Sequence, residues 1–148
     1  MRPETLLAFR IKSLNNQIGR HFERTAISEN SANLTGMQYA VLGFINENGQ
    51  DKEIYQRDIE GEFNIRRSTA SEMLQLLEKK GFIGRESVAD DARLKKIVLT
   101  KEGRELEAIA KTNAQRLQDR LTIGLSEEEL RQFYLCLLYT SPSPRDCS

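Results

Sequence analysis

The sequence has little of the chemistry on which enzymes, metal proteins and disulfide-rich proteins depend. Its 148 residues include one histidine, His21, and two cysteines, Cys136 and Cys147, which lack CxxC spacing. A structural zinc site needs several nitrogen or sulfur ligands, and a disulfide scaffold needs several cysteine pairs. No carboxylate cluster or phosphate-binding glycine loop accompanies them. We therefore expect no enzyme activity, no metal and no other cofactor, with His21 as a helix-surface group.

Net charge and long apolar runs are also lacking. The chain has 22 basic and 22 acidic side chains, so the whole molecule has no net field to attract nucleic acid or an anionic membrane. No apolar run approaches the roughly 20 residues that cross a bilayer, and residues 1–4 lack the apolar region of a signal peptide. We expect a cytoplasmic protein built around one domain. Any attraction to nucleic acid must be local.

Apolar residues recur at helical spacing toward both ends of the chain. A first stripe, within residues 2–24, consists of Leu7, Ile11, Leu14, Ile18 and Phe22. A second stripe, in a long helix capped by Thr100 and ended by Gly124, consists of Leu106, Ile109, Ala110, Leu117 and Leu121. Ser126 to Glu129 has the spacing of a capping box for a last helix. Each buried apolar side chain contributes about 1.5–3 kcal/mol, so these stripes predict a homodimer.

The central segment has the pattern of a helix-turn-helix. Thr35 and Gln38 predict a capping box at the start of a helix whose buried face is Val41, Leu42 and Ile45, with Gly49 as its end. A short helix follows, in which Ile59 and Phe63 are four residues apart. The next helix begins two or three residues later, and so short a connection predicts a helix-turn-helix.

The second helix of this unit has two chemically different faces. Apolar residues at helical spacing predict its buried face, which consists of Ala70, Met73, Leu74 and Leu77. Gly81 predicts a left-handed end. The exposed face, which suits base edges and phosphates in a major groove, consists of Arg66, Arg67, Ser68, Thr69, Ser71, Glu72 and Gln75. By itself this face has a second interpretation, because a polar helix surface is often only solvated.

A charged β-hairpin is predicted after this helix. Residues 82–85 and 95–99 have strand-like sequences, and residues 87–94 are expected to form a protruding loop. Arg93 and Lys95 are candidate DNA contacts, with Asp91 orienting the Arg93 guanidinium for a minor groove; the alternative is an ordinary exposed ion pair. Residues 64–96 contain eight basic and five acidic side chains, a net charge of +3 in a neutral chain.

Three motifs resemble those of the MarR family of bacterial and archaeal transcription regulators, over roughly residues 5–135. They are residues 77–85 (LEKKGFIGR), the pair Asp91-x-Arg93, and residues 99–104 (LTKEGR). The resemblance implies a homodimer with intertwined terminal helices, in which each winged domain reads half of a pseudo-palindromic operator in double-stranded DNA. It also implies recognition positions at residues 66–72 and a wing arginine at Arg93 with Asp91 as its partner. One position departs from the family pattern. Many members have a small residue where this sequence has Glu60, which is followed by Gly61.

These observations predict a mainly α fold with a small β-hairpin wing, a winged helix-turn-helix with N- and C-terminal dimerisation helices. We assign residues 1–33 to a first dimerisation helix and loop, 34–100 to the DNA-binding region and 101–135 to further dimerisation helices. The resemblance to the MarR family further implies transcription repression that is relieved by a small aromatic or phenolic ligand in a cleft between the dimer helices and the winged domain. The alternative is a winged helix that binds protein rather than specific DNA.

Residues 136–148 form a separate segment. The sequence from Cys136 to Asp146 resembles the translation of a sequencing adaptor, so we interpret it as read-through and the last helix as truncated. The alternative is a genuine disordered tail, which the proline and serine content also fits.

Overall fold

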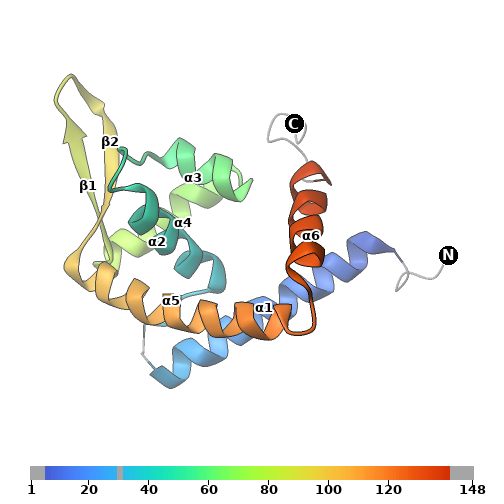
Figure 1. Ribbon diagram of the computed structural model, residues 1–148. Helices are drawn as coiled ribbons and strands as arrows, with labels where there is room; N and C mark the ends of the chain where they lie inside the picture. The colour runs from blue at the N-terminus through green and yellow to red at the C-terminus, as the bar shows by residue number, and fades with distance from the viewer. Residues whose placement is uncertain (1–5, 30–31, 141–148) are drawn as a thin grey trace.

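The computed structural model describes the backbone of residues 6–29 and 32–140, and the side chains of these residues except 22, 25–29 and 140. It confirms the mainly helical fold with a two-stranded antiparallel hairpin (Figure 1). The elements in chain order are α1 (Leu7–Glu29), α2 (Gly36–Asn48), α3 (Gln56–Phe63), α4 (Arg67–Lys79), β1 (Ile83–Val88), β2 (Asp91–Leu99), α5 (Lys101–Thr122) and α6 (Glu127–Thr140).

The predicted helix caps are confirmed. At α2 the Thr35 hydroxyl accepts a hydrogen bond from the Gln38 N–H at 3.3 Å, and the Gln38 side chain accepts one from the Thr35 N–H at 2.9 Å. At α6 the same reciprocal pair joins Ser126 and Glu129. Each box satisfies amides that have no intrahelical acceptor, which fixes where the helix begins.

The core of the winged part lies where α2, α3, α4, the hairpin and α5 meet. The predicted inward residues of α2 are buried, and Ile59 of α3 is fully buried despite the Glu60-Gly61 departure that follows it. Of the predicted rear face of α4, Met73 is half-buried, and the rest is fully buried. The hairpin contributes Ile83 and Ile97, and α5 contributes Leu106.

Two left-handed residues set the ends of α3 and α4. Asn64 has φ +49° and lets the chain turn from α3 into α4, with the Ile65 N–H donating to the Glu60 carbonyl at 3.1 Å. Gly81 has φ +82°, as its sequence position predicted, and the next N–H, of Phe82, donates to the Leu77 carbonyl at 3.0 Å. This is the hydrogen bonding of a glycine-ended helix, and it starts β1 directly after α4.

The hairpin is longer than the sequence predicted. The expectation of a loop over residues 87–94 was wrong, because β1 continues to Val88 and β2 begins at Asp91. Alternation of exposed and half-buried side chains persists through Arg93, Leu94, Lys95 and Lys96, which keeps these residues in a strand. The register shifts between Ser87 and Val88 and accommodates the extra residues of β2. An isolated bridge from Ile54 to Ile97, which the sequence did not predict, adds a third backbone segment to the sheet.

Helix α5 connects the winged part to the terminal helices, beside α1 and leading to α6 (Figure 1). The Thr100 hydroxyl caps it by accepting from the Gly103 N–H at 3.0 Å, as predicted. Of its predicted stripe, Leu106 is buried, whereas Ile109 and Leu121 are exposed. Within the described ranges no helix is both long enough and apolar enough to span a membrane. Cys136 is exposed on α6, whereas Cys147 and residues 141–148 lie outside the described residues.

Gly61 and Gly103 give opposite predictions for alanine substitution. A Cβ at Gly61, inside α3, would meet no atom within 4 Å, whereas a Cβ at Gly103 would collide with the Phe82 carbonyl. We expect Gly61→Ala to raise the free energy of unfolding by about 0.5–1 kcal/mol, and Gly103→Ala to lower it by more than about 1 kcal/mol. Urea denaturation followed by circular dichroism measures both changes. A loss of stability in Gly61→Ala would contradict the open space beside α3.

Candidate nucleic-acid interface

The N-terminal end of α4 presents backbone donors that have no acceptor within the helix. Arg66 occupies the N-cap position without a side-chain capping bond, and the first intrahelical hydrogen bond is from the Ala70 N–H to the Arg66 carbonyl at 3.0 Å. The amides of residues 67–69 precede this bond, so they have no acceptor within the helix. Together with the positive end of the helix dipole, they can receive a phosphate oxygen.

The side chains predicted to face DNA lie on one exposed surface of α4. Ser71 is half-buried, and the exposed ones are Arg66, Arg67, Ser68, Thr69, Glu72 and Gln75. The Gln75 amide approaches the Ser71 hydroxyl at 3.5 Å, one turn away. From α3, the Gln56 amide donates to the Arg67 carbonyl at 3.3 Å and holds the start of α4 against its neighbour. The structure thus brings these residues together on a supported helix end.

The wing carries Arg93 and Lys95 as exposed cations. Asp91 contacts Arg93 differently from our expectation, because its carboxylate accepts a hydrogen bond from the Arg93 backbone N–H at 2.9 Å, and the described ion pairs include none between these two side chains. Asp91 therefore shapes the tip of the hairpin and leaves the guanidinium exposed. Across the strands, the Lys95 ammonium donates to the Ser87 hydroxyl at 2.6 Å.

Cations nearer the base of the wing have structural partners. Arg85 pairs with Glu78 of α4 at 3.2 Å, and Lys96 pairs with Glu86 at 3.5 Å and with Glu53 at 3.7 Å. These pairs join the hairpin to α4 and to the segment before α3. In the described part of the chain, no ion pair involves the cations at the start of α4 or at the wing tip. The cations at those two places are therefore available for phosphate groups.

Arg57 is a further exposed cation that the sequence analysis did not identify. It lies in the first turn of α3, with its guanidinium carbon 5.1 Å from the centre of the Tyr55 ring. The Tyr55 hydroxyl donates to the Glu53 carboxylate at 2.5 Å, and this hydrogen bond raises the pKa of Tyr55 above its ordinary 10.0. Arg57 could have been identified from the sequence by its position, because it is a cation in the first turn of the helix that precedes α4.

A buried polar contact lies between α2 and α5. Glu107 is 5% exposed, and its carboxylate accepts a hydrogen bond from the Asn46 amide at 2.9 Å. Burial raises the pKa of Glu107 above its ordinary 4.5, and nearby Glu47 adds to this shift while Lys111 opposes it. This pair could not be predicted from the sequence, because Asn46 and Glu107 are 61 residues apart in the chain. It joins the winged part to the long helix.

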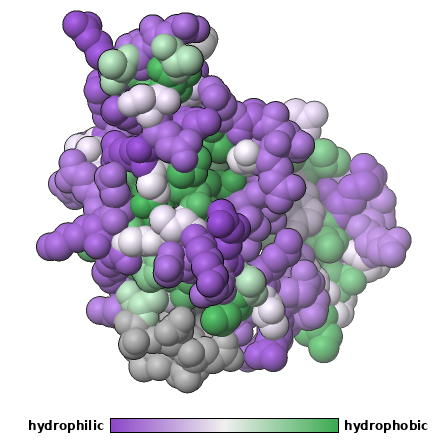
Figure 2. Space-filling view, turned by 90° about the vertical axis from the view of Figure 1, so that its left-hand side faces the viewer, coloured by the Kyte–Doolittle hydropathy of each residue, from purple (hydrophilic) through white to green (hydrophobic). Residues whose placement is uncertain are grey.

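Hydrophilic side chains cover most of the face that includes the hairpin, while apolar side chains show in patches at its centre and along its right-hand edge (Figure 2). Among the described residues, no group of three or more His, Cys, Asp or Glu side chains is placed to hold a metal ion. The exposed side chains of α4 and the wing can bind phosphates and base edges.

Comparison with known sequences finds one family and one curated relative. The sequence pattern of the MarR family matches residues 32–94, from within the α1–α2 linker into the first part of β2. A regulator from Bacillus subtilis (strain 168), described as the uncharacterised HTH-type transcriptional regulator YdgJ, is 28% identical over 129 residues, covering 86% of this chain and 73% of the relative.

Solved structures have the same fold. The transcription regulator MarR from Oenococcus oeni PSU-1 is 33% identical, with a TM-score of 0.78 over 90% of this chain and 97% of the other. MepR from S. aureus, solved as a complex with DNA, is 25% identical, with a TM-score of 0.81 over 92% of this chain and 94% of the other. The similarity extends beyond the winged part to the terminal helices.

Proposed function

Because the chain belongs to the MarR family of transcription regulators, we propose that it is a homodimeric, sequence-specific repressor that binds a pseudo-palindromic operator in double-stranded DNA. The observation that carries this proposal is the exposed cationic start of α4, whose backbone donors are open and whose rear face is rigidly buried. Proteins of this family are regulators and not enzymes. Action on chromosomal DNA would place the protein in the cytoplasm.

In this proposal α4 enters a major groove and the wing enters an adjacent minor groove. Arg66 and Arg67 pair with phosphates or with guanine, while Ser68, Thr69 and Ser71 donate to phosphates or contact a thymine methyl. Glu72 and Gln75 lie farther along the same surface and can contact base edges. Arg93 inserts into the minor groove, where negative potential favours a guanidinium, and Lys95 contacts the backbone. MepR, a protein of the same fold, is solved as a complex with DNA, which supports DNA binding by this chain.

The terminal helices support the dimer. No described side chain of α1 or α6 is buried, and Leu7 of α1 is 71% exposed. Ile11 and Leu14 continue the same stripe at 47% and 42% exposure; the side chain of Phe22 lies outside the described residues. On α6, Phe133 and Tyr134 are exposed as well. Surfaces of this size on a lone protomer indicate an interface, and a second copy covers both helices at once.

We place the effector in a cleft between α1 and the winged part. This cleft, beside α1, has a volume of about 540 Å³. Its apolar lining includes Ile18, Met37, Ala40 and Phe63, and Arg20 supplies a cation. Asn15, Asn16, Glu23 and Thr35 are polar members of the same lining. An apolar wall beside a cation suits a small aromatic ligand that carries a carboxylate or phenolate. Ligand binding in this cleft would change the angle between α1 and the reading head, which consists of α3, α4 and the wing. Repression would weaken as a result.

The main test of the function is DNA binding as a function of salt. We expect duplexes selected from a random pool to bind steeply more weakly as salt rises, because phosphate contacts release counterions. Arg93→Ala should lower both the affinity and the slope of log K against log salt, the latter by about 1. Arg66→Ala or Thr69→Ala should change which sequences are selected more than Lys95→Ala does. A flat salt response would instead favour a winged helix that binds protein.

The dimer has a separate test on α1. Leu14→Glu should raise the dissociation constant of the dimer at least about 100-fold, because an unpaired buried carboxylate costs about 3 kcal/mol or more. Ser13→Glu introduces the same charge at the neighbouring exposed position, off the stripe, and is the matched control. Sedimentation velocity over a range of protein concentrations measures both. A wild-type protein that stays monomeric at micromolar concentration would overturn the homodimer.

The effector cleft is tested with benzoate as the probe. Arg20→Gln should weaken benzoate binding by about tenfold, because a hydrogen bond to a charged group contributes about 1.5–3 kcal/mol. Arg24→Gln removes an exposed charge one turn away, outside the cleft lining, and should leave binding unchanged. Isothermal titration calorimetry measures the affinities, with benzyl alcohol as the uncharged comparison. Equal affinities for benzoate in both variants would exclude Arg20 as the anchor.

A further inference from the structure

We infer that Lys80 is a positioning residue, which ties the linker between α1 and α2 to the C-terminal end of α4 and so sets the orientation of the reading head relative to α1. The effect of this contact on DNA binding rests on the proposed function, whereas the contact itself does not. The sequence analysis counted Lys80 among the cations of the interface. The structure gives its ammonium a different partner.

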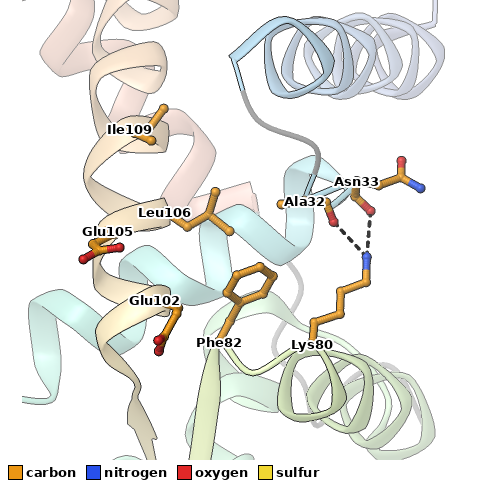
Figure 3. Close-up of a pocket in the computed structure, with 8 residues that line it drawn as sticks. All are labelled: Ala32, Asn33, Lys80, Phe82, Glu102, Glu105, Leu106 and Ile109. Atoms are coloured by element: carbon orange, nitrogen blue, oxygen red, sulfur yellow. Dashed lines mark hydrogen bonds between the residues drawn. The ribbon is translucent and has the colours of Figure 1, made fainter.

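The contact joins two segments that are far apart in the sequence. Lys80 is the C-cap residue of α4, and its ammonium donates to the backbone carbonyls of Ala32 at 2.8 Å and Asn33 at 3.2 Å. Figure 3 shows both hydrogen bonds crossing from the end of α4 to the linker. Asn33 has φ +50°, so the linker turns at the position where the ammonium holds it.

The linker is anchored firmly on its α2 side. Leu34 is buried in the core, and Thr35 caps α2. The hydrogen bonds of Lys80 add two residues, Ala32 and Asn33, to this anchored region on the side of Glu29, where α1 ends. Lys80 joins this linker to the end of α4 with two charge-assisted hydrogen bonds.

A cavity beside this contact makes Lys80 more important than its exposure suggests. About 580 Å³ of open space separates the linker residues Ala32 and Asn33 from Phe82, Leu106 and Ile109 (Figure 3). Ala32 is partly buried against the core, so side-chain packing holds the linker only in part beside this space. The ammonium of Lys80 adds a second restraint to this packing.

The consequence in a dimer concerns the distance between the two reading heads. Half-sites of a palindromic operator lie about one helical turn, or a multiple of it, apart, so each α4 must be held at a fixed angle to its own α1. Without the tether, each head samples more orientations, and binding has to restrict them at an entropic cost. Affinity then falls although the phosphate contacts are unchanged.

The experiment compares Lys80→Gln with Lys79→Gln. Both variants lose one positive charge at the end of α4, but Lys79 is exposed and has no ion pair or side-chain hydrogen bond in the described part of the chain. We measure binding to selected operator DNA over a range of salt, and to the same DNA with one base pair inserted or deleted between the half-sites. Lys80→Arg tests rescue, because a guanidinium can donate to both carbonyls.

We expect Lys80→Gln to lower operator affinity by about fivefold without changing the salt slope, and to reduce the preference for the natural half-site spacing. Lys79→Gln should keep that preference, and Lys80→Arg should restore it. A salt slope lowered by about 1 in Lys80→Gln would make Lys80 a phosphate contact and overturn the inference. An unchanged spacing preference would do the same.

Hydrogen–deuterium exchange separates this inference from the proposed function. In the free protein, the amides of residues 33–35 should exchange faster in Lys80→Gln than in Lys79→Gln, whether or not the protein binds DNA. If the wild-type protein bound no duplex, the repressor proposal would fail, while faster exchange would still support the tether. Equal exchange in both variants would overturn the tether itself.

Discussion

Burial of one face of α4 is the constraint on which the interface depends. Because successive residues of a helix are about 100° apart, fixing Ala70, Leu74 and Leu77 in the core also fixes which side chains face outward. Arg66, Thr69 and Glu72 are exposed for that reason. A helix free to rotate on its axis would present a mixture of faces, and contacts with base edges would lose their specificity.

The same core determines where the wing and the long helix lie. Gly81 directs the chain from α4 straight into β1, and Gly103 allows the first turn of α5 to approach the Phe82 carbonyl. The bridge between Ile54 and Ile97 then secures β2 to the segment before α3. The wing is consequently a rigid extension of the core rather than a separate hairpin, and its tip is held at a set distance from α4.

Local patterns in the sequence were sufficient for the helices and their caps. Thr35 with Gln38 and Ser126 with Glu129 lie within one turn, and a left-handed end needs only Gly81, so each can be read from neighbouring residues. The remaining features depend on residues far apart in the chain. Lys80 meets the linker 47 and 48 residues away, and Glu107 meets Asn46 61 residues away. No local periodicity encodes such contacts, and the length of the strands depended likewise on cross-strand pairing.

The contact made by Asp91 has a consequence for how quickly the wing can engage a polyanion. If its carboxylate held the Arg93 guanidinium, that pair would have to separate, at a desolvation cost, before the arginine could move into a groove. The carboxylate instead holds the backbone of Arg93. The hairpin tip keeps its shape while the guanidinium remains hydrated and unpaired by Asp91, so no internal bond has to break on encounter.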